Sequence, residues 1–198
     1  YRNPVMILAD GMLGQMMEPI VLPEPVPALK QEDIPRVRPW ALTGTNEARP
    51  HNVIRSLYLK AEELEAHILK LDKKYQKARA ELVEYEAINL TDAEVVFVAY
   101  GSTARITEET LEMLAKEGIR AGLIRPISLW PYPYEAFDKI PPSAKAVISV
   151  ELSMGQMIDD VKIGCRGRFS VSLINRTGGI LLTPHEIAAG AKKVLGVE

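Results

Sequence analysis

The segment YGSTARI at residues 100–106 holds the side chains best suited to binding chemistry. Gly101 permits a tight backbone turn, and the hydroxyls of Ser102 and Thr103 can donate hydrogen bonds. Arg105 can pair with a carboxylate or a phosphate, and a helix N-terminus close behind the segment would add a positive field. Neither GxGxxG nor GxxxxGKS/T is present, and turn and capping chemistry also accounts for these residue types. Both interpretations therefore stay open.

Two other expected strand ends carry side chains that suit contact with a partner. The segment RPISLWPYP, which begins at Arg125, leaves its strand through prolines and aromatic rings, and this favours a shape-specific contact over catalysis. The segment AVISVELSMGQM at 146–157 places Glu151 at a strand end, with Ser153 behind it. The segment PVMILADGMLGQM at 4–16 ends in the same way, with an apolar run, an acid and Gly-Gln-Met. We expect both corners to present backbone and methionine to a partner, with chance similarity as the alternative.

Residues that usually carry catalysis or bind metals are sparse. The histidines His51, His67 and His185 have no ligand spacing between them, and no CxxC occurs. Cys165 has arginine neighbours that would lower its pKa but no visible base partner, so we expect it to be inert. The sequence therefore predicts no catalytic residue and no metal site within this chain.

From Thr91 onward, the pattern alternates between strands and helices. The expected strands are 94–100, 119–125, 145–152 and 169–175, and the expected helices are 107–118, 155–164 and 183–196. Thr107 is the expected N-cap of the first helix, and Thr183 with Glu186 forms a capping box at the last. Strands and helices in this order predict right-handed βαβ units, a parallel sheet and an α/β domain over residues 91–198.

Three segments precede that domain. Residues 4–9, PVMILA, have the continuous apolar pattern of a strand that is covered on both faces. The prolines between residues 19 and 50 exclude a lasting helix or inner strand and predict an extended connector. Residues 51–90 are expected to hold one long amphipathic helix.

The long helix is expected because apolar residues recur in steps of three and four from residue 54 to residue 85. They are Ile54, Leu57, Ala61, Leu64, Ile68, Leu71, Tyr75, Ala78, Leu82 and Tyr85. This is a heptad seam, and it must be buried against a second helix, another subunit or a long groove. His67 lies off the seam and is expected to be solvated.

Composition excludes several classes of protein. The net charge of −2 and the absence of a Lys/Arg cluster interleaved with aromatics argue against nucleic-acid binding. No apolar run approaches the roughly 18 residues of a membrane span. The single cysteine fits a reducing compartment and predicts a cytoplasmic location. Because Tyr1 is not an initiator methionine and a strand pattern follows at once, we expect a carboxy-terminal fragment of a longer protein.

Four segments together resemble a known family. YRNPVMILADGMLGQMMEP, VFVAYGSTARI, IRPISLWPYPYEAF and VELSMGQMIDDV are similar to the alpha subunit of 2-oxoacid:ferredoxin oxidoreductases, above all to the 2-oxoisovalerate (3-methyl-2-oxobutanoate) branch. The resemblance extends over almost the whole chain. It implies an enzyme that oxidatively decarboxylates a branched-chain 2-oxoacid to its acyl-CoA and passes electrons through iron–sulfur clusters to ferredoxin. Its cofactors would be thiamine diphosphate with Mg, the clusters, and coenzyme A as acyl acceptor.

The resemblance also implies how the chain is organised. The expected parts are the last strand of a truncated pyrimidine-binding domain at 1–18, the proline-rich connector at 19–50, the long amphipathic helix at 51–90 and a domain similar to the transketolase C-terminal domain at 91–198. No cofactor would be bound wholly by this chain, since the ligands would lie in the absent part and on partner subunits of the beta, gamma and delta type.

No catalytic residue of the family can be carried onto a position of this chain. Gly101, Ser102, Thr103 and Arg105 are expected to lie near the cofactor or the active site, supporting it rather than reacting. The alternative is a freestanding α/β interaction module that oligomerises through its long helix. The sequence leaves open which 2-oxoacid is used.

Overall fold

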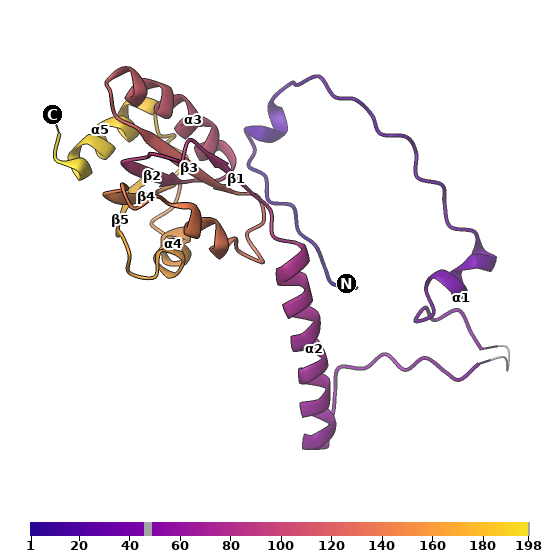
Figure 1. Cartoon of the computed structure of the whole chain (residues 1–198). Helices are drawn as coiled ribbons and strands as arrows, with labels where there is room; N and C mark the ends of the chain where they lie inside the picture. Colours follow the sequence, from indigo (N-terminus) through magenta and orange to yellow (C-terminus); the bar gives the residue numbers. More distant parts are fainter. Residues whose placement is uncertain (46–48, 198) are drawn as a thin grey trace. The chain divides into compact units, whose positions relative to one another are not determined.

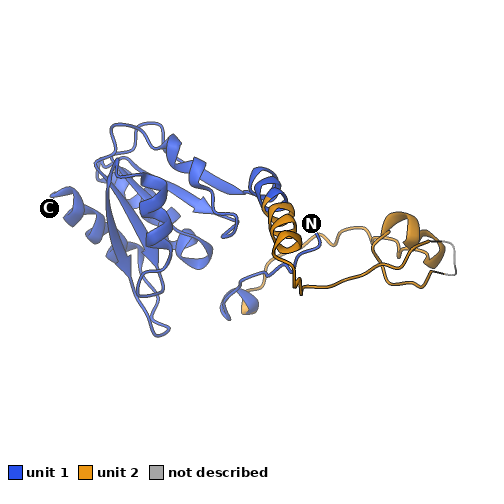
Figure 2. Ribbon diagram, turned by 90° about the horizontal axis from the view of Figure 1, so that it is seen from below, with its two compact units in different colours: residues 1–14, 73–198 blue, residues 15–72 orange. Residues whose placement is uncertain are grey.

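The computed structural model of the chain describes residues 1–45 and 49–197. It divides into two compact units, Tyr1–Gly14 with Lys73–Glu198 and Gln15–Asp72, which Figure 2 colours blue and orange. The first unit contains the sheet and its covering helices. The second contains most of the connector and the first half of helix α2.

A five-stranded sheet forms the centre of the first unit (Figure 1). Its strands are β1 Tyr85–Ile88, β2 Val95–Val98, β3 Ala121–Pro126, β4 Ala146–Glu151 and β5 Ser170–Asn175, in the spatial order β1-β3-β2-β4-β5. Strands β2 to β5 are parallel, with Val95 of β2 opposite Ala121 of β3 and Ala146 of β4. Strand β1 is antiparallel to β3 and lies at one edge. The predicted α/β fold with a parallel sheet is confirmed.

Helices cover both faces of the sheet (Figure 1). On one face, helices α3 Gly101–Lys116 and α5 Pro184–Leu195 bury a core with Phe97, Leu123 and Ile148. On the other face, helix α4 Met157–Cys165 and the 3-10 helix η3 Tyr134–Lys139 pack on the neighbouring residues of the same strands. Successive strand residues point to opposite faces, which is why the strands are apolar throughout.

Helix α3 begins six residues before the predicted N-cap. Thr107 is fully buried inside the helix, where its hydroxyl donates to the carbonyl of Thr103 at 2.7 Å. The prediction failed because the early glycine and hydroxyl residues resemble a loop, although Gly101 with φ +58 only introduces the first turn. The capping box at the start of α5 is confirmed, since Thr183 accepts from the Glu186 backbone and the Glu186 carboxylate accepts from the Thr183 backbone.

Helix α2 spans Ala61–Glu81 and is shorter than the heptad pattern predicted. Ile54 and Leu57 lie outside it with 61% and 69% of their surface exposed, so no packing stabilises an earlier start. At the other end, Tyr85 opens strand β1, because pairing with β3 outweighs the helical period. The helix expected within residues 51–90 is therefore shorter than predicted at both ends.

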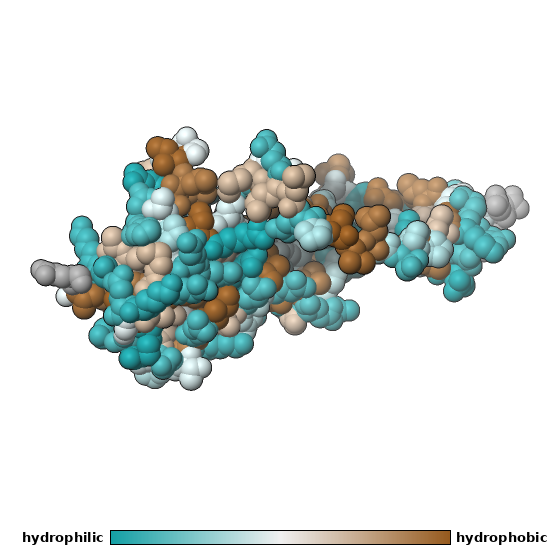
Figure 3. All heavy atoms as spheres, turned by 90° about the horizontal axis from the view of Figure 1, so that it is seen from above, coloured by the Kyte–Doolittle hydropathy of each residue, from teal (hydrophilic) through white to brown (hydrophobic). Residues whose placement is uncertain are grey.

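The strand expected at residues 4–9 is not formed. The segment is irregular, and the side chains of Val5, Met6, Ile7 and Leu8 are all more than half exposed. A strand requires a neighbour that accepts and donates its backbone hydrogen bonds, and neither β1 nor β5 pairs with this segment. Figure 3 shows that hydrophobic residues, in brown, stand on the surface among hydrophilic ones.

The connector has little regular structure among its described residues. Its short elements are the 3-10 turn η2 Gln31–Asp33 and the single helical turn α1 Ile34–Val37, and the 3-10 turn η1 Leu13–Gln15 comes before it. The prolines explain why only short turns form here, since each proline removes a backbone hydrogen-bond donor and fixes φ. None of the helices in the described residues is long and apolar enough to cross a bilayer.

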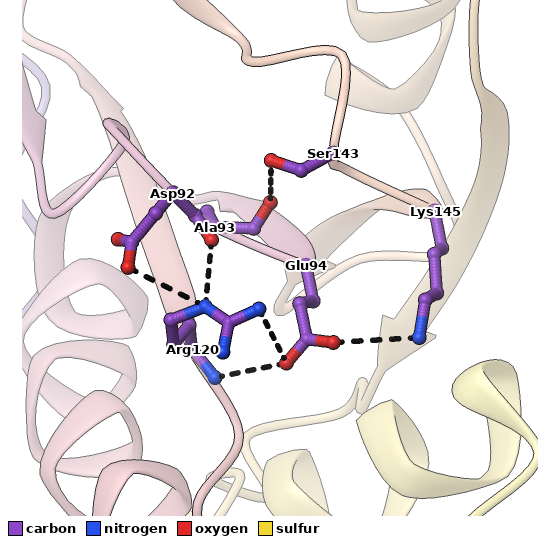
Figure 4. Close-up of polar contacts among 6 residues, drawn as sticks. All are labelled: Asp92, Ala93, Glu94, Arg120, Ser143 and Lys145. Atoms are coloured by element: carbon purple, nitrogen blue, oxygen red, sulfur yellow. Dashed lines mark hydrogen bonds and ion pairs between the residues drawn. The ribbon is translucent and has the colours of Figure 1, made fainter.

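An ion-pair network ties together the amino ends of β2, β3 and β4 (Figure 4). The Glu94 carboxylate receives Lys145 at 3.4 Å and Arg120 at 3.5 Å, and Arg120 also pairs with Asp92 at 3.4 Å. Ser143 donates to the carbonyl of Ala93 at 3.2 Å. A cavity lined in part by Asp92, Arg120 and Ala121 lies beside this network. Because ligands of open parallel sheets bind outside the carboxyl ends of the strands, the opposite edge is where a site is expected.

Candidate functional site

The connections of the sheet define a switch point between β2 and β4. Strand β2 continues through α3 to β3 on one side, whereas β4 continues through α4 to β5 on the other side. In open parallel sheets, a crevice forms outside the carboxyl ends of two strands whose connections diverge in this way. Residues 100–105 follow β2, and residues 152–156 follow Glu151, the last residue of β4. Both segments singled out in the sequence therefore lie at this edge.

The residues predicted as a site form one structural feature, which we call the candidate corner: Gly101, Ser102, Thr103 and Arg105. The first three build the first turn of α3, behind the extended N-cap residue Tyr100. Ser102 and Thr103 are each only 6% exposed, and the Thr103 hydroxyl donates to the Tyr100 carbonyl at 2.6 Å. Arg105 stands on the exposed side of the helix. The Thr103 hydroxyl thus closes the turn, while the Ser102 hydroxyl points elsewhere.

Asp10 is the partner of Ser102. The Ser102 hydroxyl donates to Asp10 Oδ2 at 2.5 Å, and the backbone N–H of Leu13 donates to Asp10 Oδ1 at 2.8 Å. The hydrogen bond from Ser102, followed by that from Leu13, holds the pKa of Asp10 below its usual value. Sequence analysis singled out both segments but missed that they touch. A contact across 92 residues leaves no local pattern in the chain.

Glu151 lies at the end of β4 and is 4% exposed. Its carboxylate accepts hydrogen bonds from the hydroxyls of Ser149 and Ser153, both at 2.8 Å. It also accepts from the backbone N–H groups of residues 156, 157 and 158, where α4 begins. Burial alone would raise the pKa of Glu151, but the donors led by the Gln156 N–H hold it below its usual value. The buried charge is fully satisfied and fixes the start of α4.

The two Gly-Gln-Met corners share a local device. In each, the acid after the apolar run accepts backbone N–H groups from the turn that follows, Asp10 from Leu13 and Glu151 from Gln156. The expectation that both follow a strand is wrong for the first corner, because residues 4–9 form no strand. In the first corner, Gly14 lies within the turn η1; in the second, Met157 is the first residue of α4.

The exit from β3 exposes Ile127 and Trp130, while Pro131, Tyr132 and Pro133 are buried. Ile127 is 51% exposed and Trp130 is 57% exposed. Tyr75 of α2 meets the Trp130 ring edge-on at 5.6 Å. Tyr134 donates to Asp160 at 2.5 Å and joins the exit to α4. This arrangement suits contact with a partner surface, which stays a prediction.

The other candidate residues lie apart from the corner. Cys165 is 1% exposed, and burial raises its pKa to about 11, with Arg168 opposing the shift. His67 was expected to be solvated but is half-buried, because its ring stacks on Tyr58 with centroids 4.6 Å apart. Among residues 1–45 and 49–197, no three His, Cys, Asp or Glu side chains gather to hold a metal ion.

The candidate corner combines two buried hydroxyls with one exposed guanidinium at the start of α3. Both hydroxyls already donate within the chain, Ser102 to Asp10 and Thr103 to Tyr100. Asp10 is the carboxylate that faces the Ser102 hydroxyl, and its lowered pKa makes it a weak base. The exposed charge of Arg105 and the helix start are the features that suit an anionic group. These features suit the binding and orientation of such a group.

Comparison with known proteins gives one family and several close relatives. The sequence model of the family described as "Pyruvate:ferredoxin oxidoreductase core domain II" matches residues 93–187. Subunit VorB of the ketoisovalerate oxidoreductase of Methanothermobacter marburgensis is 38% identical over 198 residues, 99% of this chain and 54% of that subunit. Subunit KorA of the 2-oxoglutarate synthase of Methanocaldococcus jannaschii is 29% identical, over 94% of this chain and 55% of that subunit.

The fold has a counterpart among solved structures. A 2-oxoglutarate:ferredoxin oxidoreductase from Magnetococcus marinus superposes with a TM-score of 0.62 at 21% identity, over 78% of this chain and 28% of that one. At this identity the likeness concerns the fold alone. The chain spans about half the length of the curated relatives it matches.

Proposed function

Because this chain belongs to the 2-oxoacid:ferredoxin oxidoreductase family, we propose that it forms part of an enzyme that oxidatively decarboxylates a branched-chain 2-oxoacid. The products would be the acyl-CoA and reduced ferredoxin. The observation that carries this proposal is the 38% identity to a ketoisovalerate oxidoreductase subunit, sustained over 99% of the chain. Relatives that are 2-oxoglutarate synthase subunits are more distant, at 29% identity or below.

We assign this chain a supporting role in that enzyme. The corner at the switch point carries the exposed Arg105 side chain at a helix start, and the exit from β3 exposes Ile127 and Trp130. The candidate corner would lie next to the active site, and the domain from residue 91 would serve assembly with other subunits. Residues 4–9 would become a strand only where another sheet offers a neighbouring edge.

The cofactors of the reaction would be held elsewhere. Thiamine diphosphate with Mg and iron–sulfur clusters would supply decarboxylation and electron transfer in the complete enzyme. The residues described here do not fit these groups, since Cys165 is buried and no cluster of metal ligands occurs among them. We therefore derive no catalytic step for this chain. Other subunits, ferredoxin and coenzyme A are its proposed partners, and the single cysteine supports a cytoplasmic location.

Reconstitution tests the proposal. The chain alone is expected to show no reduction of ferredoxin or of a viologen dye with 2-oxoisovalerate and coenzyme A. The complete enzyme that contains this chain is expected to show turnover, faster with 2-oxoisovalerate than with 2-oxoglutarate. Turnover by the isolated chain, or none by the complete enzyme with any 2-oxoacid, would refute it.

The second candidate is an interaction module that oligomerises through its helix. Leu64 and Ile68 on the heptad seam of α2 are 40% and 53% exposed, which favours a partner for that stripe. Analytical ultracentrifugation distinguishes this case. A monomer at high concentration would exclude oligomerisation through α2.

A further inference from the structure

The leading segment, residues 1–14, is attached to its unit by polar side chains. The hydroxyl of Tyr1 donates to Glu81, Lys74 donates to Asn3 at 2.6 Å, and Ser102 donates to Asp10 at 2.5 Å. The first two contacts reach the last turns of α2, and the third reaches the first turn of α3 (Figure 1).

The apolar side chains of the leading segment do not share in this attachment. Val5 is 91% exposed, Ile7 is 90% exposed and Leu8 is 66% exposed. The segment therefore presents polar residues to the domain and apolar residues to the outside. A few hydrogen bonds, rather than apolar burial, hold it where it lies.

Asp10 makes two contacts within this attachment. Its Oδ1 atom closes the turn at Leu13, and its Oδ2 atom receives the buried hydroxyl of Ser102. The carboxylate thus connects the end of the leading segment to the candidate corner directly.

We infer that Asp10 is a positioning residue, which ties the leading segment to the first turn of α3 through Ser102 and so holds the candidate corner in place. Its effect on turnover rests on the function proposed above. The physical basis is that the two donors reach different oxygens of the carboxylate. An asparagine would place an NH₂ group at one of these two positions, and an alanine would offer no acceptor at either.

Amide hydrogen exchange of the chain tests the contact itself. Ser102→Ala is expected to speed exchange of the Leu13 and Gly14 amides by about threefold to tenfold, because one net hydrogen bond is lost. Ser102→Thr, which retains a hydroxyl, is expected to restore most of the protection. Ser143→Ala is the matched control, since it removes one hydroxyl contact at the opposite end of the sheet. Equal exchange in wild type and Ser102→Ala would overturn the inference.

Kinetics of the complete enzyme test the positioning role. Ser102→Ala and Asp10→Ala are each expected to lower kcat by about threefold to tenfold with little change in KM. The double variant is expected to be no slower than the slower single variant, because both remove one contact. Altered exchange with unchanged kcat would overturn the positioning role. Absence of turnover in the wild-type enzyme would instead count against the proposed function, while the exchange result still decides the contact.

Discussion

At the scale of single residues, the acids that follow apolar runs hold the backbone beyond them. Glu151 does so from a buried position with five donors around it, and Asp10 does so from an exposed one. The difference in burial determines how much free energy of unfolding is lost when each carboxylate is removed. Loss of the Glu151 carboxylate would leave several buried donors unsatisfied. Loss of the Asp10 carboxylate would leave one, the Ser102 hydroxyl, because water reaches the rest of that exposed turn.

Glu151→Gln is expected to lower the free energy of unfolding by about 2–3 kcal/mol, since an amide nitrogen would face N–H groups that now donate to the carboxylate. Urea unfolding followed by circular dichroism measures the loss. The exposed Glu135→Gln is the control and is expected to change stability by less than about 0.5 kcal/mol. Equal effects of the two substitutions would contradict the structural role of Glu151.

Glu186 predicts a pH dependence. Its pairing with Arg176, together with hydrogen bonds from Thr183, lowers the pKa of Glu186 from 4.5 to about 2. Because the pKa of Glu186 is lower in the folded than in the unfolded protein, its ionised form stabilises the fold at pH values above the unfolded-state pKa. This stabilisation is lost as the pH falls from about 5 towards 2. The stability difference between wild type and Glu186→Gln is therefore expected to shrink over that range. A difference that is constant with pH would argue against the ion pair.

At the scale of elements, a backbone segment that passes close to a strand limits which side chain the strand can carry at that position. A Cβ atom at Gly122 in β3 would lie 2.8 Å from the carbonyl oxygen of Asn89 and 2.8 Å from Leu90 Cδ2. The connection between β1 and β2 crosses this point of β3, so glycine is required by the neighbour rather than by its own φ. A neighbouring strand also limits helix α2. The apolar helical pattern continues to Tyr85, but α2 ends at Glu81 because Tyr85 pairs with β3.

Gly122→Ala is expected to destabilise the domain by about 1–3 kcal/mol, because the contacting backbone atom cannot move away as a flexible side chain would. Thermal unfolding measures this effect. Gly14→Ala is the matched control, since a Cβ atom there meets nothing within 4 Å. A Gly122→Ala protein as stable as the control would show that the Asn89 connection shifts freely.

At the scale of the whole molecule, exposed apolar residues mark what this chain does not cover by itself. Residues 5–8 and the exit from β3 remain open, while the sheet and its helices bury their own core. In the proposed enzyme, other parts of the protein or other subunits would cover these surfaces.

Ile7→Asp tests whether the leading segment is covered in the complete enzyme. Because Ile7 is 90% exposed, the substitution is expected to leave the stability of the chain within about 0.5 kcal/mol of wild type. Recovery of the complete enzyme by size-exclusion chromatography is expected to fall. Ile163→Asp on α4, at a residue that is 60% exposed, is the comparison, and an equal loss of assembly with both would remove the special role of the leading segment.

The sequence by itself determined the parallel sheet, the order of its strands along the chain and the capping box at Thr183, because these follow from local apolar patterns and local hydrogen bonds. It also determined the family, through motifs spread along the chain. Only the tertiary structure decided that residues 101–106 are helical, that Tyr85–Ile88 pair as a strand and that Ser102 meets Asp10. These features depend on partners far away in the sequence, and the free energy of such contacts leaves no periodic trace in the chain.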